Sequence, residues 1–136
     1  MLRVEITQPE MPAEGNFVRI MSMHKSKGLT SRVTVVVGCV HGLIPYIDDD
    51  ISLAEMPAHL EEQRRVFYVA LTRAKEILVI SSAATLPRRL ARQIGAIVQG
   101  GNRYVGQTVA CEFIDDLGPN APATLFGPAW VEQGYP

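Results

Sequence analysis

Residues Glu61–Lys75 read EEQRRVFYVALTRAK, and this stretch decides the expected fold. Leu60, Phe67 and Leu71 fall on one face of a helix at about 100° per residue. We therefore expect a helix over about residues 58–74, with that face packed against a core. The apolar residues 76–81 that follow are typical of a short strand.

A second informative stretch lies about forty residues upstream, where Ser22–Leu29 reads SMHKSKGL. The loose alternation of residues 18–23 predicts a strand before the turn at Lys27 and Gly28. The β-branched run 32–38 predicts a strand covered on both faces in a parallel sheet. Short strands alternating with helices indicate an α/β fold with an open, mostly parallel sheet.

The remaining segments carry weaker signals. We expect a loop, a helix after Pro87, a turn, an amphipathic piece and an irregular tail, over residues 42–57, 88–98, 100–102, 109–117 and 118–136 respectively.

Length and composition set broad limits. The 136 residues suit one domain, with a formal net charge of −1. Residues 59–92 contain seven Lys or Arg against three Asp or Glu, which suits either a surface for a polyanion or ordinary solvated helix charge. Cys39 and Cys111 lack the spacing of a zinc site, and Cys39 is expected to be a small buried hydrophobe. With no secretory leader and no apolar run near ~20 residues, we expect a cytoplasmic protein without membrane contact.

The two stretches, in this order and with the valine-rich run 33–37 between them, closely resemble the fifth and sixth motifs of superfamily 1 helicases of the UvrD/Rep/PcrA type. The resemblance covers about residues 18–83, and Cys111–Leu117 looks like a weaker echo of the segment that often closes the family's domain. It implies a RecA-like fold, the second motor domain of such a helicase. The chain has no G-x-x-x-x-G-K-[ST] phosphate loop, so the resemblance is to an incomplete half of a motor.

That resemblance divides the chain into three parts. Residues 1–17 are a lead-in, residues 18–118 are the UvrD-like helicase C-terminal RecA-like domain, and residues 119–136 are a tail containing Pro and Gly.

By its position in Tyr-Val-x-x-Thr-Arg-Ala, the residue that resembles the family's catalytic, nucleotide-contacting arginine is Arg73. Such an arginine, reaching in from a neighbouring domain, stabilises the negative charge that grows on a γ-phosphate and contributes ~10³–10⁵-fold in rate. The alternative is a surface arginine favoured by the dipole at the end of a helix.

The first motif carries the other implied contacts. The resemblance places Ser22 and His24 beside single-stranded DNA, and Gly28 and Thr30 near the nucleotide. Gly28 also suits a backbone turn that a side chain would obstruct. The family normally has Glu where this chain has Thr30, so the ribose contact is in doubt. Loss of a charged hydrogen bond of this kind costs ~1.5–3 kcal/mol.

Two neighbouring arginines are less informative. Arg64 and Arg65 follow Glu61 and Glu62 at helical spacing and suit intrahelical ion pairs. We favour a structural role for Arg64 and leave Arg65 open.

The resemblance implies ATP and Mg²⁺ only for a complete motor, with no cofactor and no metal held by this chain alone. The isolated chain is therefore expected not to hydrolyse ATP. The implied partners are single-stranded DNA and a first RecA-like domain that bears the phosphate loop, from the same gene or a separate chain.

Two functions stay open. One is the C-terminal motor segment of a UvrD-like ATP-dependent DNA helicase. The other is a non-catalytic RecA-like module that binds single-stranded DNA or a partner protein. The RecD-like branch of the superfamily is a weaker match, because it tends to have Gln-Gly where this chain has Lys27-Gly28.

Overall fold

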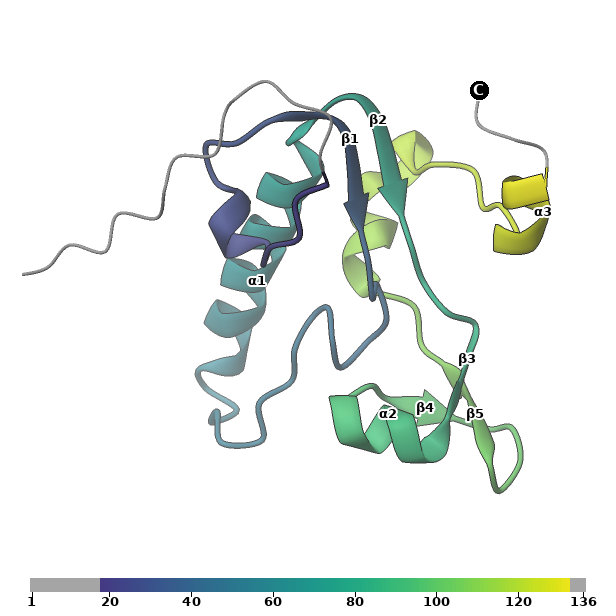
Figure 1. The fold of residues 1–136 in the computed structure, drawn as a ribbon. Helices are drawn as coiled ribbons and strands as arrows, with labels where there is room; N and C mark the ends of the chain where they lie inside the picture. Colours follow the sequence, from purple (N-terminus) through teal and green to yellow (C-terminus); the bar gives the residue numbers. More distant parts are fainter. Residues whose placement is uncertain (1–17, 133–136) are drawn as a thin grey trace, which may run out of the picture.

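The computed structural model describes residues 18–132, which form a mixed α/β fold (Figure 1). β1 and β2 form a two-stranded parallel sheet, and β3, β5 and β4 form a three-stranded antiparallel sheet in that order. The elements, in chain order, are η1 (His24–Ser26), β1 (Ser31–Val36), α1 (Met56–Leu71), β2 (Ala74–Ile80), β3 (Thr85–Pro87), α2 (Arg88–Ile94), β4 (Val98–Gln99), β5 (Val105–Thr108), η2 (Glu112–Asn120) and α3 (Gly127–Glu132).

The β1–α1–β2 unit confirms the predicted pair of parallel strands joined by a helix. Val33 lies opposite Ile77, and Val35 lies opposite Val79. The helix ends at Leu71, three residues before the predicted end at 74, with Thr72 as its C-cap, and Ala74 opens β2 instead. Arg73 therefore lies in the short connection between α1 and β2.

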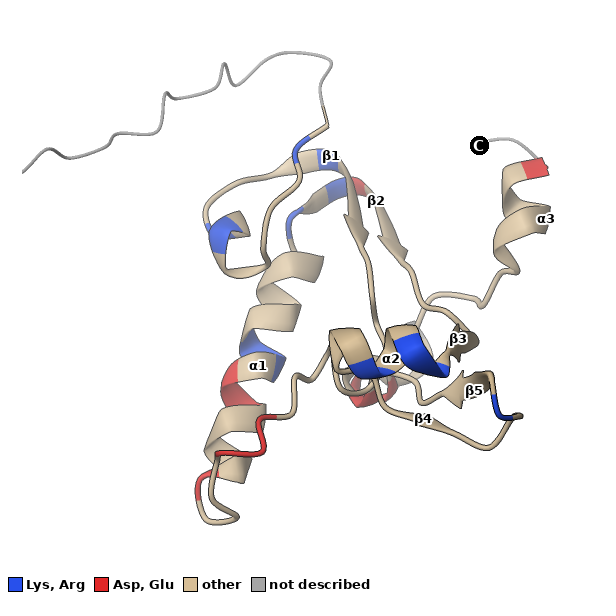
Figure 2. Ribbon diagram, turned by 60° about the horizontal axis from the view of Figure 1, so that its bottom comes forward, with Lys and Arg blue, Asp and Glu red and all other residues tan. Residues whose placement is uncertain are grey.

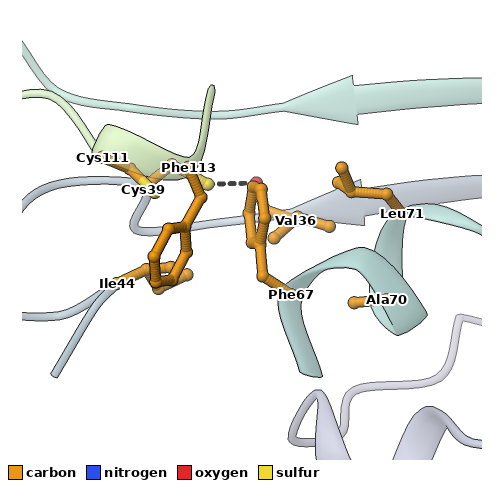
Figure 3. Packing of buried hydrophobic residues seen from close by; sticks show 8 residues of the cluster. All are labelled: Val36, Cys39, Ile44, Phe67, Ala70, Leu71, Cys111 and Phe113. Atoms are coloured by element: carbon orange, nitrogen blue, oxygen red, sulfur yellow. Dashed lines mark hydrogen bonds between the residues drawn. The ribbon is translucent and has the colours of Figure 1, made fainter. Parts of the chain in front are cut away.

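The core lies between one face of this parallel sheet, α1 and η2 (Figure 3). Phe67 of α1 and Phe113 of η2 are fully buried, with ring centroids 5.8 Å apart and planes tilted by 46°. Tilted ring pairs of this kind contribute ~0.5–1.5 kcal/mol beyond the burial of their area. The other buried members of the cluster are Val36, Cys39, Ile44, Ala70, Leu71 and Cys111.

The backbones of the two cysteines are hydrogen-bonded, since the Cys111 N–H donates to the Cys39 carbonyl at 3.2 Å. Both thiols are free and buried, which confirms Cys39 as a small hydrophobe of the core. Burial and, next, the neighbouring Cys111 raise the pKa of Cys39 from 9.0 to about 12. The Cys39 thiol therefore stays protonated at neutral pH.

The antiparallel sheet was not foreseen from the sequence. β5 pairs on both sides, with β3 and with β4, and the predicted turn at 100–102 joins β4 to β5. Backbone hydrogen bonds of His41 connect the region of the antiparallel sheet to the chain after β1. The His41 carbonyl accepts the Ile97 N–H at 2.9 Å, and the His41 N–H donates to the Val109 carbonyl at 2.8 Å. At Gly42 a Cβ would collide with the Gly95 carbonyl, so this approach requires a residue without a side chain.

Four expectations were wrong in whole or in part. Residues 18–22 do not form a strand, and no strand of the described residues 18–132 pairs with them. The strand β1 is covered on one face alone, since Val36 is 6% exposed but Val35 is 53% exposed. The mostly parallel sheet is limited to β1 and β2, because the second sheet is antiparallel. The expected irregular tail contains the short helix α3.

Replacement of Phe113 by alanine tests the core. We expect Phe113→Ala to lower the free energy of unfolding by about 3–5 kcal/mol, because it empties a fully buried ring site. Urea denaturation followed by circular dichroism measures this. The matched control is Phe126→Ala, which removes a ring that is 76% exposed and should change stability by less than about 0.5 kcal/mol. Equal effects of the two substitutions would contradict the packing described here.

Candidate functional site

Arg73 is held at the junction of the two sequence motifs. Its Nε donates to the Val69 carbonyl at 2.9 Å, and its Nη1 donates to the Leu29 carbonyl at 3.3 Å. Its Nη2 donates to the Thr72 hydroxyl oxygen at 3.1 Å. The Arg73 carbonyl in turn accepts the N–H of Ser31, the first residue of β1, at 3.0 Å. The side chain and backbone of one residue thus tie the end of α1 to the start of β1.

These contacts have a structural purpose of their own. The last carbonyls of a helix lack backbone partners, and Val69 is one of the residues in the last turn of α1. Its carbonyl accepts from the Arg73 side chain and from the Thr72 hydroxyl, which donates at 2.9 Å. Arg73 therefore also caps the C-terminus of α1, where the helix dipole favours a positive charge.

The Arg73 side chain retains capacity to bind an anion. A guanidinium carries five N–H donors, and three contacts to described residues are made. Two donors are left for another acceptor, and the residue is half-buried. A partly fixed, partly open guanidinium suits bidentate recognition of a phosphate.

The loop of the first motif lies directly against Arg73. Gly28 has φ = +83°, a conformation that favours glycine, which confirms the predicted turn. The turn presents the Leu29 carbonyl to Arg73, and Thr30 follows it in an exposed position. Gly28, Thr30 and Arg73, predicted separately as nucleotide contacts, are thus brought into one small region.

Ser22 and His24 lie at the other end of this loop. The Ser22 carbonyl accepts the Lys25 N–H at 3.1 Å and starts the turn of η1, and both Ser22 and His24 are exposed. His24 lines a hollow of about 210 Å³ between η1 and α1. The other residues that line it are Met23, Lys27, Glu62, Arg65, Val66 and Val69. His24 and Lys27 of the first motif therefore line the same hollow as Arg65 of the second motif.

The other arginines of α1 are engaged in ion pairs. Arg64 binds Asp116 of η2 at 2.8 Å and Glu61 at 2.9 Å, and its guanidinium lies 5.3 Å from the centroid of Phe113. Hydrogen bonding to Asp116 raises the pKa of Arg64. These contacts agree with the structural role that we favoured. Arg65, whose role the sequence left open, pairs with Glu62 at 3.0 Å and also lines the hollow.

Charge is distributed rather than gathered. Figure 2 shows basic residues on η1, α1 and α2, and acidic residues toward the first half of α1 and the loop before it. Within residues 18–132, no group of three or more His, Cys, Asp or Glu side chains is placed to hold a metal ion. The helices of the same part of the chain are too short or too polar to span a membrane.

A family model described as the UvrD-like helicase C-terminal domain matches residues 4–85. The matched range contains both sequence motifs, the β1–α1–β2 unit and every candidate site residue named above. The chain belongs to this family.

Individual relatives share the same region. The chain is 45% identical over 69 residues to YjcD of Bacillus subtilis strain 168, and 41% identical over 70 residues to the ATP-dependent DNA helicase PcrA of Staphylococcus epidermidis strain ATCC 12228. It is 39% identical over 70 residues to PcrA of Staphylococcus aureus strain NCTC 8325. The alignments cover 49%, 52% and 52% of this chain but 9% of each relative. The chain therefore spans less than a tenth of the length of these curated relatives.

Sequence reasoning missed the groups that position Arg73. The Thr72 hydroxyl bridges Val69 and Arg73, and the Leu29 carbonyl comes from a loop far away in sequence. Thr72 had a visible signal, because it stands beside Arg73 just after the expected helix. A backbone carbonyl has no sequence signal.

Replacement of Thr72 tests this positioning. Thr72→Val keeps the shape but removes the hydroxyl that accepts from the Arg73 Nη2. We therefore expect the Arg73 Nη2–H to exchange with water faster, by roughly five- to tenfold for the loss of a hydrogen bond of about 1 kcal/mol. Arginine-selective NMR of the Nη–H groups at low temperature measures this rate. Thr72→Ser keeps the hydroxyl and should restore the slow exchange. If the valine and serine variants exchange alike, the hydroxyl does not hold the guanidinium.

Proposed function

We propose that this chain is the C-terminal motor segment of a UvrD-like ATP-dependent DNA helicase. It supplies an arginine to a nucleotide bound by a first RecA-like domain, and it contacts single-stranded DNA. ATP and Mg²⁺ belong to the complete motor, and the isolated chain is not competent for hydrolysis. In this proposal residues 18–118 are the RecA-like part, flanked by the lead-in 1–17 and the tail 119–136.

The observation that carries the proposal is the setting of Arg73. Its guanidinium is fixed by three hydrogen bonds and keeps two donors open, next to Gly28 and Thr30. A group of fixed position and permanent charge is what stabilises a transition state that carries more negative charge than its ground state. Family membership supports the same role, because the name of the PcrA relatives describes ATP-dependent DNA helicases.

The DNA side rests on Ser22 and His24. His24 is exposed and lines the hollow together with Lys27 and Arg65, and Ser22 is exposed just before η1. A strand backbone would find positive charge and hydrogen-bond donors there. Because Glu62 pairs with Arg65, the positive charge is modest. Binding by this chain alone is accordingly weak and sensitive to salt.

Thr30 favours the second candidate, a non-catalytic module that binds single-stranded DNA or a partner protein. Its side chain is shorter than the usual Glu and carries no charge, so a ribose contact from this position is weaker. The two candidates differ in whether Arg73 accelerates hydrolysis, and the next experiment separates them.

Arg73→Ala should abolish most hydrolysis in a reconstituted motor, by about 10³-fold, with association nearly unchanged, because the guanidinium acts on transition-state charge. Phosphate release is measured with a first RecA-like domain that bears a phosphate loop. Arg73→Lys should restore little, since an ammonium lacks the fork. The control, Arg89→Ala, removes an exposed charge from α2 and should leave the rate unchanged.

Because Arg73 also caps α1, thermal denaturation of each variant is measured to separate a loss of stability from a loss of hydrolysis. Hydrolysis by Arg73→Ala at the rate of the unmodified motor would favour the non-catalytic module.

His24→Ala should weaken binding to single-stranded DNA without unfolding the domain, because the side chain is exposed. Fluorescence anisotropy of a labelled oligothymidylate measures affinity at several salt concentrations, and thermal denaturation of the same samples reports the fold. Titrations that superimpose would make His24 a structural residue.

A further inference from the structure

One segment of the chain carries charge of a single sign. Basic residues are spread over the molecule, but residues 77–111 contain four arginines and neither Asp nor Glu, although the whole chain has a formal net charge of −1. The segment includes α2 and all three strands of the antiparallel sheet. Its arginines lie outside the range 4–85 that matches the family model, so the match assigns them no role.

Arg88 fixes the geometry of this part of the molecule. Its backbone N–H donates to the Tyr104 carbonyl at 2.8 Å, and its Nε donates to the Asn102 carbonyl at 2.8 Å. Its Nη2 donates to the Gly100 carbonyl. The Asn102 side chain accepts the backbone N–H groups of Tyr104 and Val105 at 2.8 and 2.9 Å. The turn between β4 and β5 is thereby held against the first residue of α2.

The other three arginines are open to a ligand. Arg89 and Arg92 are neighbours on the surface of α2, three residues apart, and Arg103 lies in the turn before β5. All three are exposed, and no ion pair within residues 18–132 includes any of them. Figure 2 shows the basic residues on α2 and on the turn beside β5. Unpaired guanidinium groups of this kind suit the bidentate recognition of phosphate.

An aromatic ring stands beside these charges. The guanidinium of Arg103 lies 4.9 Å from the centroid of the Tyr104 ring, and Tyr104 is still 68% exposed. Proteins that bind single-stranded nucleic acids combine positive charge along the backbone with aromatic rings on which bases stack. Arg89, Arg92, Arg103 and Tyr104, termed here the arginine face, bring both elements together.

We infer that the arginine face binds single-stranded nucleic acid, with phosphates on its three arginines and a base stacked on Tyr104. A single strand fits better than a duplex, because its bases are free to stack on a ring. Anionic lipids and phosphorylated proteins offer phosphate without a base, so they leave the Tyr104 ring without a stacking partner.

This surface is separate from the candidate site described above. Figures 1 and 2 both show α2 apart from η1, the element that carries His24. The arginine face also has no part in hydrolysis, so the inference does not depend on the role proposed for Arg73.

Binding to labelled oligonucleotides tests the base contact. Tyr104→Ala should weaken binding of the complete chain to an oligothymidylate at least about fivefold, because a stacked base is lost. The affinity for an abasic strand of equal length and charge should not change. Tyr104→Phe keeps the ring and should bind both strands as the wild type does. The control, Phe126→Ala, removes a ring that is 76% exposed outside the arginine face and should bind like the wild type. Fluorescence anisotropy measures the affinities.

Salt dependence tests the phosphate contacts. On a single strand, each phosphate contact contributes about 0.7 to the slope of log affinity against log salt concentration. Arg89→Ala and Arg103→Ala should each lower the slope by about that amount and weaken binding to both strands. The control, Arg32→Ala, removes the same charge from an arginine that is paired with Glu76 at 3.0 Å and should leave the slope unchanged.

Three outcomes would overturn the inference. The first is an oligothymidylate affinity that Tyr104→Ala does not change. The second is an equal loss on the oligothymidylate and the abasic strand, which would make the ring structural. The third is binding to phosphatidylserine vesicles that depends on Arg89 and Arg103 while oligothymidylate binding does not, which would make a lipid surface the ligand.

The double variant with His24→Ala separates this inference from the proposed function. Because the two surfaces are apart, Tyr104→Ala should cause the same fold loss with and without His24→Ala. A loss with His24→Ala but none with Tyr104→Ala would remove the arginine face and leave the DNA contact of the first motif in place.

Discussion

The contact between Phe67 and Phe113 holds the described structure together. Phe67 comes from α1 and Phe113 from η2, so one ring pair fixes the helix, the parallel sheet and the chain after the second sheet against one another. The Arg64–Asp116 ion pair joins the same two elements, and the Arg64 guanidinium lies over Phe113. Exposed ion pairs contribute little by themselves, so the buried rings supply most of the energy of this junction. The position of Arg73, just after α1, depends on it.

The sequence predicted those elements whose signal is local. The helix α1 has a clear apolar face, and β1 and β2 are β-branched runs, so all three were located within a few residues. The segment 18–23 alternates as a strand does, but the described chain offers it no neighbour, and a strand exists only through pairing. The antiparallel sheet was missed for the converse reason. β3 and β4 are only a few residues long, and β5 stabilises them from both sides.

The candidate site was predictable to the extent that it consists of side chains. The two motifs do meet, since η1 and α1 share a hollow and Arg73 contacts the loop after Gly28. The Leu29 carbonyl, in contrast, is available to Arg73 only because Gly28 turns the backbone with positive φ. The residue type at position 29 does not predict a hydrogen bond to its backbone carbonyl. The coverage of β1 was overestimated because an apolar run shows that a strand is suited to burial, not that this chain supplies its cover.

The three hydrogen bonds to Arg73 also determine when its conformational entropy is lost. An unconstrained arginine gives up ~1.5–2 kcal/mol of rotamer freedom when it is fixed. Here the Val69 and Leu29 carbonyls and the Thr72 hydroxyl restrict the side chain as the domain folds. Any anion that reaches its two remaining N–H groups meets a group that is already ordered, so binding does not bear that cost. The entropy cost of ordering this side chain therefore falls on folding and not on ligand binding.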